Sequence, residues 1–141
     1  MKQRIINPST LSRPSGFSHG ILVEGGRTLF LAGQTGSDAT GRIADPNDLV
    51  RQFDLAIANL GAVVADAGGV LGDVVKLNVF VRSRDDYVAK LKPLGGVFRK
   101  RFGGHYPAMA LFEVSGLFQK EALVEIEGIA VLESKPPLRS R

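Results

Sequence analysis

Five stretches of the chain carry the alternating or continuous apolar patterns that predict β-strands. The segments ILVEGG and TLFLAG meet at Gly25-Gly26-Arg27, which predicts a β-hairpin with a glycine turn. Similar patterns mark residues 73–81, 108–114 and 124–131. In the last two stretches the period is two, so successive side chains should point to opposite faces of a sheet.

Two further segments have the three- and four-residue apolar spacing of amphipathic helices. The first begins at Asp45-Pro46-Asn47-Asp48, where a capping side chain precedes a proline at the first helical position, and it runs to Gly68. The second begins at Ser83-Arg84-Asp85-Asp86 and continues through Phe102. Pro93 lies inside it and removes a backbone hydrogen bond, so we expect a kink, or a short first piece and a restart at Pro93.

The resulting order is ββαβαββ, which predicts an α+β domain with two helices on one face of the sheet. Residues 1–134 form this single domain, and residues 135–141 form a basic tail that we expect to be disordered. Several strands are apolar on both faces, although two helices can cover only one. The uncovered face should therefore meet another subunit.

The stretch from Tyr106 to Val131 carries the most chemical information. Its first predicted strand is apolar on both faces, and its second places Glu125 and Glu127 opposite Val124 and Ile126. We interpret the two segments as a strand pair that bears carboxylates. Carboxylates in such apolar surroundings are costly and indicate a function. Two glutamates without a metal-ligand pattern do not form a metal site, and Glu113 is expected to be structural.

Several motifs, in the right order, resemble the RidA family, also called YjgF. They are GFSHG at residues 16–20, LFLAGQTG at 29–36, VVKLNVFV at 74–81, the Tyr106 to Val131 stretch and, within it, EIEGIAV at 125–131. The resemblance covers nearly the whole chain. It implies a chorismate-mutase-like fold, a homotrimer with three clefts between neighbouring subunits, and hydrolysis of imines or enamines. Sites in such clefts draw residues from two chains.

The resemblance also assigns roles to individual residues. Glu125 matches the acid that positions the hydrolytic water, and Gly33 and Leu111 match positions whose main chain lines the cleft. The alternative for Glu125 is a surface carboxylate on an alternating strand, and for Gly33 a bulge or close strand packing.

Three positions depart from the family pattern. Phe17 replaces a Tyr that contributes a hydroxyl, Leu91 replaces an Asn, and Met109 replaces the Arg that holds the substrate carboxylate. All three changes run from polar to apolar. They indicate either a cleft remodelled for a less polar ligand or drift in an unused cleft. In both cases we expect the standard 2-imino acid deaminase activity to be weak or absent, because a bidentate Arg contact to a carboxylate has been lost.

Composition narrows the remaining possibilities. The 141-residue chain contains no cysteine, which removes thiol chemistry and fits a cytoplasmic location, and no apolar run is long enough to cross a bilayer. The net charge of +4 comes from scattered residues, with clusters only at Arg99-Lys100-Arg101 and in the tail, and neither cluster interleaves with aromatics. This pattern does not favour a nucleic-acid partner. The two histidines, His19 and His105, are too far apart for a local metal motif, and we expect no cofactor.

Two functions from different classes therefore remain open. The first is a small-metabolite hydrolase of the imine or enamine deaminase type with an altered intersubunit cleft. The second is a non-catalytic trimer that binds a small molecule or a protein. An endoribonuclease activity, with which some relatives are labelled, ranks below both. Met109 argues against the standard deaminase, whereas the retained Glu125 argues against a complete loss of chemistry.

Overall fold

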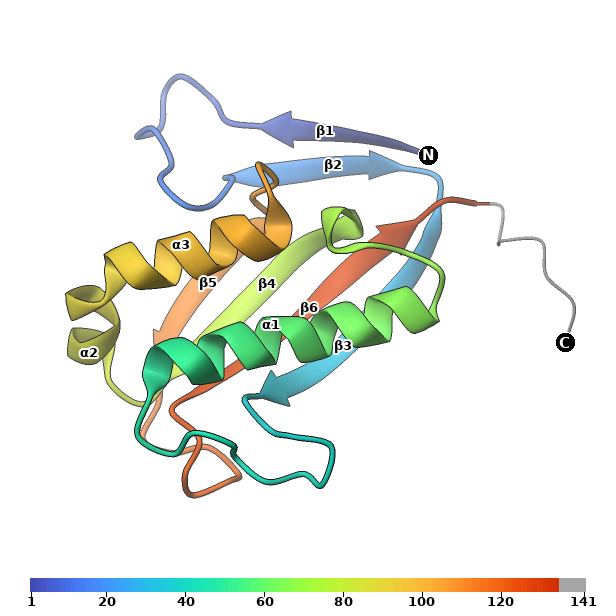
Figure 1. Ribbon diagram of the computed structural model, residues 1–141. Helices are drawn as coiled ribbons and strands as arrows, with labels where there is room; N and C mark the ends of the chain where they lie inside the picture. Colours follow the sequence, from blue (N-terminus) through green and yellow to red (C-terminus); the bar gives the residue numbers. More distant parts are fainter. Residues whose placement is uncertain (135–141) are drawn as a thin grey trace, which may run out of the picture.

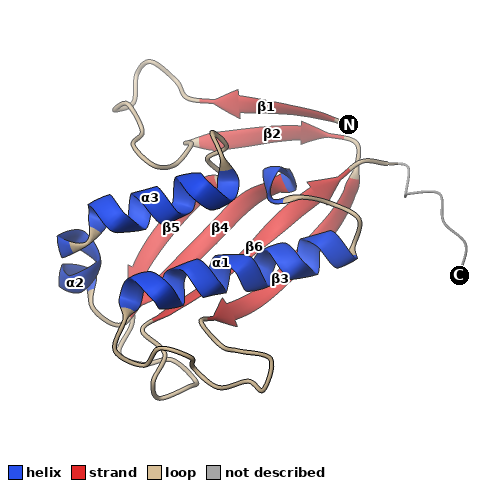
Figure 2. Ribbon diagram, in the orientation of Figure 1, coloured by secondary structure: helices blue, strands red, loops and turns tan. Residues whose placement is uncertain are grey.

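The computed structural model describes residues 1–134; the predicted basic tail at 135–141 lies outside the described residues. The described chain forms a mixed sheet covered by helices on one face (Figures 1 and 2). Its elements are, in order, β1 (Lys2–Ile6), β2 (Gly20–Glu24), β3 (Arg27–Thr35), α1 (Leu49–Asp66), a short 3-10 helix (Leu71–Asp73), β4 (Val74–Val81), α2 (Arg84–Ala89), α3 (Leu91–Phe102), β5 (Ala108–Glu113) and β6 (Val124–Leu132).

The main sheet has the strand order β3-β6-β4-β5. β6 pairs antiparallel with both β3 and β4, and β4 pairs in parallel with β5. The connection between the parallel strands carries α2 and α3, as a parallel crossover requires. The predicted α+β class, with two main helices on one face, is confirmed.

The hydrophobic core lies between this sheet and the helices. α1 buries one stripe of its surface, at the spacing read from the sequence, and so covers β3 and β6 (Figure 1). The sheet contributes completely buried side chains, including Leu77, Val124 and Ile126. The helix begins later than predicted: Asp48, rather than Asp45, is the capping residue, and its side chain accepts a hydrogen bond from the Arg51 amide at 3.1 Å.

The second predicted helix is divided in two. α2 is capped by Ser83, whose hydroxyl accepts from the Asp86 amide, and it ends at Ala89. α3 restarts at Leu91, which places Pro93 in its first turn. A proline is tolerated there because amides of the first turn have no partner within the helix. The expected short first piece and restart are thus confirmed, with the break three residues before Pro93.

The predicted hairpin between residues 21–26 and 28–33 is wrong. β2 pairs instead with β1, a strand that the sequence pattern did not reveal, in a separate two-stranded sheet. Gly25 and Gly26 form the turn, with φ values of 77° and 88°, but the chain leaves it in a new direction and β3 joins the main sheet. A turn sequence encodes a reversal of the chain without dictating which strand edges pair.

The segments 108–114 and 124–131 are both strands, but their interpretation as a strand pair is also wrong. β4 lies between β5 and β6. β5 is consequently an edge strand, and none of its side chains is fully buried. The face of the sheet away from the helices is open and carries exposed aromatic side chains, among them Phe30 at 76% and Phe112 at 45% exposure.

Candidate functional site

A cavity of about 520 Å³ lies beside β5 on the helix side of the sheet. Four residues singled out from the sequence line it, namely Phe17, Leu91, Met109 and Leu111. Met109 and Leu111 are paired with Leu77 and Val79 of β4, both buried beneath the helices. Paired residues of neighbouring strands share a face, so the side chains of Met109 and Leu111 also point to the helix side.

Phe17 reaches this cavity from the loop between β1 and β2. The next residue, Ser18, anchors the loop at the start of β5: its amide donates to the Pro107 carbonyl at 3.0 Å and its hydroxyl to the Tyr106 carbonyl at 2.6 Å. Ser18 is buried at 5% exposure. These backbone-directed bonds position Phe17 at the cavity, and its ring also packs edge-on against the His19 ring with centroids 5.3 Å apart.

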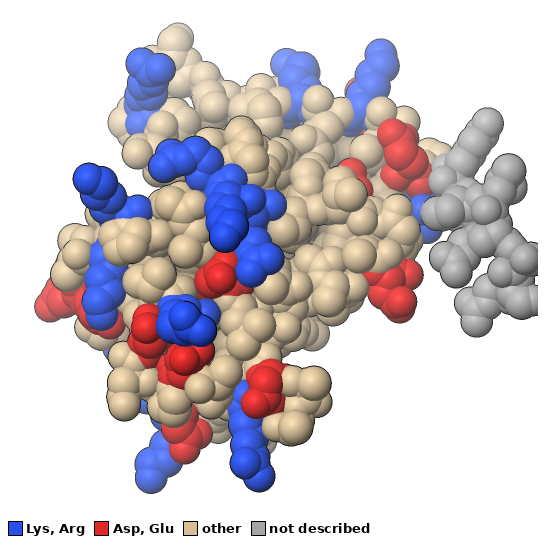
Figure 3. Space-filling model, viewed as in Figure 1, with Lys and Arg blue, Asp and Glu red and all other residues tan. Residues whose placement is uncertain are grey.

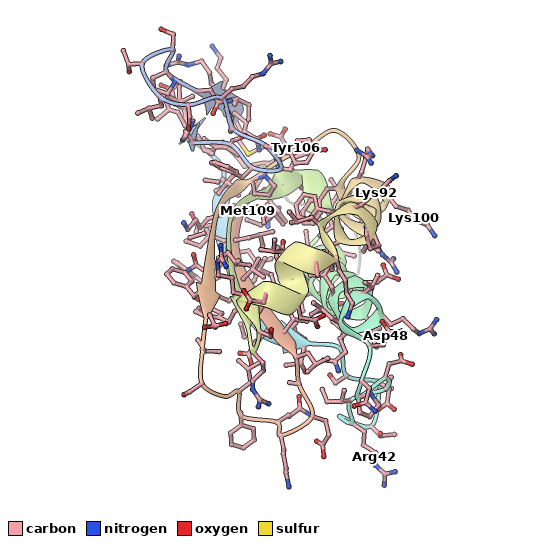
Figure 4. The ribbon with its side chains drawn as sticks, turned by 90° about the vertical axis from the view of Figure 1, so that its left-hand side faces the viewer. Arg42, Asp48, Lys92, Lys100, Tyr106 and Met109 are labelled. Carbon is pink, nitrogen blue, oxygen red and sulfur yellow. The ribbon has the colours of Figure 1, made fainter. Side chains whose placement is uncertain are left out.

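The cavity also contains residues that sequence reasoning missed. Gly95 and Arg99 line it from α3, Tyr87 from α2, and Tyr106 from the segment before β5. A signal for two of them was present, because Leu91, Gly95 and Arg99 recur every four residues and so share one helix face. Figure 4 shows Tyr106 and Met109 on the sheet side of α3, while Lys92 and Lys100 project away from it.

Two of these lining residues are tyrosines. Tyr106 stacks on Phe98 with ring centroids 5.8 Å apart, and Tyr87 packs edge-on against Phe53 at 6.2 Å. Burial raises the pKa of the Tyr87 phenol, because the charged form would be poorly solvated there. Tyr87 is therefore neutral and able to donate a hydrogen bond at physiological pH.

Glu125 and Gly33 lie together on the opposite, open face of the sheet. Glu125 neighbours the fully buried Ile126 on β6, and adjacent residues of a strand face opposite sides. Its carboxylate packs directly over Gly33, so that a β-carbon at position 33 would overlap Oε2 and come within 2.9 Å of Cδ. In the described chain no hydrogen bond occupies this carboxylate, which leaves it free to hold a water.

The six residues singled out from the sequence therefore form two groups. The four around the cavity face the helices, and Glu125 with Gly33 faces the open side. A single chain does not bring both groups to one ligand. A complete site that uses all six requires two copies of the chain, with the open face of one against the β5 edge of the other.

The remaining polar candidates have structural roles. Glu113 accepts from the Arg84 amide at 2.8 Å and so caps α2, and Glu127 accepts from Asn78 at 3.2 Å. The ring of His19 bonds to the Ser12 carbonyl and that of His105 to the Val74 carbonyl. Within residues 1–134, no three His, Cys, Asp or Glu side chains converge as a metal site. No described helix is long and apolar enough to cross a membrane.

The sequence and the fold match one family of proteins. The family model described as Endoribonuclease L-PSP matches residues 10–132. This chain belongs to that family, the YjgF/RidA family. It is 36% identical to a RutC family protein of Pyrococcus abyssi, over 94% of this chain and all of the relative. It is 33% identical to a 2-iminobutanoate/2-iminopropanoate deaminase of Dermatophagoides farinae, over 93% of this chain and 98% of that enzyme.

Solved structures agree with this assignment. A protein of the conserved Rid family from Yersinia pestis, of unknown function, superposes with a TM-score of 0.84 at 36% identity, covering 94% of this chain and all of that one. A putative endoribonuclease from Thermotoga maritima gives a TM-score of 0.67 at 29% identity, covering 94% and 99%. The expected family is thereby confirmed.

Proposed function

We propose that this protein is a hydrolase of the imine or enamine deaminase type whose cleft is altered in specificity. The observation that carries the proposal is the placement of Phe17, Leu91, Met109 and Leu111 around one cavity, with Glu125 free on the open face. These are the positions to which the family resemblance of the sequence assigns a match or a departure. Relatives named as 2-iminobutanoate/2-iminopropanoate deaminases support the reaction class.

Two copies of the chain form each proposed cleft. The cavity lies at the β5 edge, where Leu91 and Leu111 are 54% and 40% exposed, and Glu125 belongs to the open face. These are two different surfaces, so the contact between copies is heterologous, and a heterologous contact that closes on itself forms a ring. A homotrimer with three equivalent clefts satisfies this requirement. It also covers the exposed Phe30 and Phe112.

In the proposed reaction, Glu125 accepts a proton from a water that attacks the carbon of a C=N bond. The resulting carbinolamine passes both protons of the water to its nitrogen, the first by way of Glu125; the C–N bond then breaks, the nitrogen leaves as ammonia, and a carbonyl product remains. Gly33 allows the carboxylate to approach the main chain closely, and the main chain at Leu111 lines the cleft. Positioning of this water supplies much of the rate, because orientation alone can lower a barrier by several kcal/mol.

The altered residues predict a changed substrate preference. Met109 cannot hold a carboxylate as an arginine does, and Phe17 and Leu91 remove further polar groups from the cavity wall. Hydrolysis of 2-iminobutanoate should therefore be slow. Met109→Arg should restore part of it, and only part, because Phe17 and Leu91 depart from the family pattern as well.

The test measures decay of 2-iminobutanoate, generated in situ by an amino-acid oxidase, with wild type, Met109→Arg and Glu125→Gln. We expect Met109→Arg to be faster than wild type and Glu125→Gln to abolish the enzymatic rate. If the wild-type protein is as fast as an ordinary deaminase of the family, the proposed change in the specificity of the cleft is wrong. If no imine is hydrolysed by any variant and Glu125→Gln leaves ligand affinity unchanged, the protein is a non-catalytic binding module.

A mixing experiment tests whether two chains share each cleft. Gly95→Leu should block the cavity, since no atom lies within 4 Å of a β-carbon placed there and the residue lines the cavity. Trimers reassembled from Gly95→Leu and Glu125→Gln chains should recover activity in about one quarter of the clefts, which combine an open cavity with an intact Glu125 from a neighbour. Gly96→Leu is the matched control, because its β-carbon is equally free but the residue does not line the cavity. No recovery in mixed trimers would refute the shared cleft.

An endoribonuclease function has weaker support. Lys and Arg are interspersed with Asp and Glu over the helical face rather than gathered into one basic surface (Figure 3). The Arg99-Lys100-Arg101 cluster lies in the last turn of α3, where basic residues favour the helix dipole. A small molecule is thus the proposed ligand, and a cytoplasmic location remains a prediction.

A further inference from the structure

Arg99 is the only charged side chain among the described residues that line the cavity of about 520 Å³. Of the other lining residues, a serine and two tyrosines carry hydroxyl groups and the rest are apolar. No carboxylate of the described chain lines the cavity to neutralise the guanidinium. None of the ion pairs within residues 1–134 includes Arg99. Arg99 is solvent-exposed at the rim of this largely apolar cavity, so its guanidinium is accessible to the anionic group of a ligand.

The neighbouring arginine leaves α3 on a different side from Arg99. Arg101 is two positions further along α3, about 200° around the helix, and it pairs with Asp54 of α1 at 2.7 Å. Arg99 therefore points away from α1. It shares its helix face with Leu91 and Gly95, which also line the cavity.

The ends of the cavity differ in character. α3 runs opposite to β5 (Figure 1), and Phe98, next to Arg99, stacks on Tyr106 before β5 begins. Arg99 thus lies at the end of the cavity that also holds Tyr106 and Met109. Leu91, at the other end, is eight residues away, or about 12 Å along the helix. Gly95 between them leaves the wall open.

We infer that Arg99 binds the anionic group of an elongated apolar carboxylate whose hydrocarbon part extends along the cavity toward Leu91 and Leu111. The inference rests on the proposed function for the choice of site. It deepens that proposal by naming the substrate class: a molecule with one carboxylate and an apolar body several carbons long. The carboxylate anchor missing at Met109 is supplied from the opposite wall.

Calorimetric titrations with hexanoate, hexanamide and propanoate test the inference on the intact, full-length protein. Hexanoate should bind more tightly than hexanamide, its uncharged match, and more tightly than propanoate, which lacks the apolar length. Arg99→Gln should weaken hexanoate binding about ten-fold or more and leave hexanamide unchanged. Gly95→Leu should weaken both.

Lys100→Gln is the matched control, because Lys100 follows Arg99 on the same helix but projects away from the cavity (Figure 4). It should leave both affinities unchanged. Equal losses for Arg99→Gln and Lys100→Gln, or no detectable binding of hexanoate, would overturn the inference. Binding that depends on Arg99 in a protein that hydrolyses no imine would uphold this inference and overturn the proposed hydrolase. Imine hydrolysis whose rate is unchanged by Arg99→Gln would uphold the proposed hydrolase and overturn this inference.

Discussion

Replacement of Gly33 by alanine should separate chemistry from stability. A β-carbon at position 33 would overlap the Glu125 carboxylate and lie 2.9 Å from its Cδ and 3.1 Å from its Cγ, where ordinary contacts are 3.4 to 4 Å. The carboxylate is the far end of a flexible side chain, so it can rotate away. The backbone at Gly33 does not have a positive φ, and alanine is therefore compatible with it.

The expected consequences follow from these distances. Loss of glycine entropy in the unfolded chain stabilises a protein by about 0.4–1 kcal/mol at compatible sites, which offsets the local crowding. Gly33→Ala should therefore change the free energy of unfolding by less than about 1 kcal/mol. A carboxylate displaced by roughly 1 Å can cost about 100-fold in rate, so imine hydrolysis should fall by that order.

Gly128→Ala provides the contrast. A β-carbon there would overlap the Lys76 carbonyl oxygen and lie 2.9 Å from Leu77 Cδ2. A backbone oxygen within the sheet cannot rotate away, so this variant should lose about 1–3 kcal/mol of stability. Urea denaturation measures the stabilities, and imine decay measures the rates.

A double-mutant cycle completes the experiment. In a Glu125→Ala background no carboxylate remains to be displaced, so Gly33→Ala should have no further effect on the residual rate. Full activity of Gly33→Ala in the wild-type background, or equal destabilisation by the two glycine substitutions, would show that the Gly33–Glu125 contact does not organise the site.

Three further predictions concern stability and assembly. The raised pKa of Tyr87 means that the folded state keeps its phenolic proton to higher pH than the unfolded state does. The free energy of unfolding should therefore fall as pH rises above about 10. Tyr87→Phe should reduce this loss, as measured by urea midpoints across alkaline pH. Phe112→Asp, at a side chain 45% exposed on the open face, should give folded monomers by circular dichroism and sedimentation, and a stable trimer would contradict the proposed burial of that face. Ile126→Ala, at a fully buried position, should cost about 2–5 kcal/mol, and a loss below 1 kcal/mol would show that the core collapses around it.

The strands and helices were largely predictable because their buried apolar residues recur along the sequence with the period of a strand or of a helix. β1 escaped detection for the same reason, since four of its five residues are exposed and carry no apolar alternation. Strand pairing was a different matter. A period of two fixes which face a side chain takes, as it did for Met109 and Leu111, but it says nothing of the neighbouring strand, and both proposed pairings failed.

The candidate site shows a similar division. Residues identified through family motifs, such as Phe17 and Met109, do line one cavity. Tyr87 and Arg99 were missed because a helix face becomes a cavity wall only when the packing of α3 on β5 is known. The separation of Glu125 from that cavity has two causes. Successive side chains of a strand point to opposite faces of the sheet, which the sequence shows. The order of the strands in the sheet also matters, and the sequence does not reveal it.

The position of β6 has a consequence for biosynthesis. β6 is the last strand of the described chain, yet it lies between β3 and β4. Before β6 has been synthesised, β4 and β5 can pair with each other, whereas β3 has no partner in the main sheet. The nascent chain therefore carries an unpaired strand edge until β6 has been synthesised, a state prone to aggregation. The main sheet of this domain can therefore close only after β6 has left the ribosome.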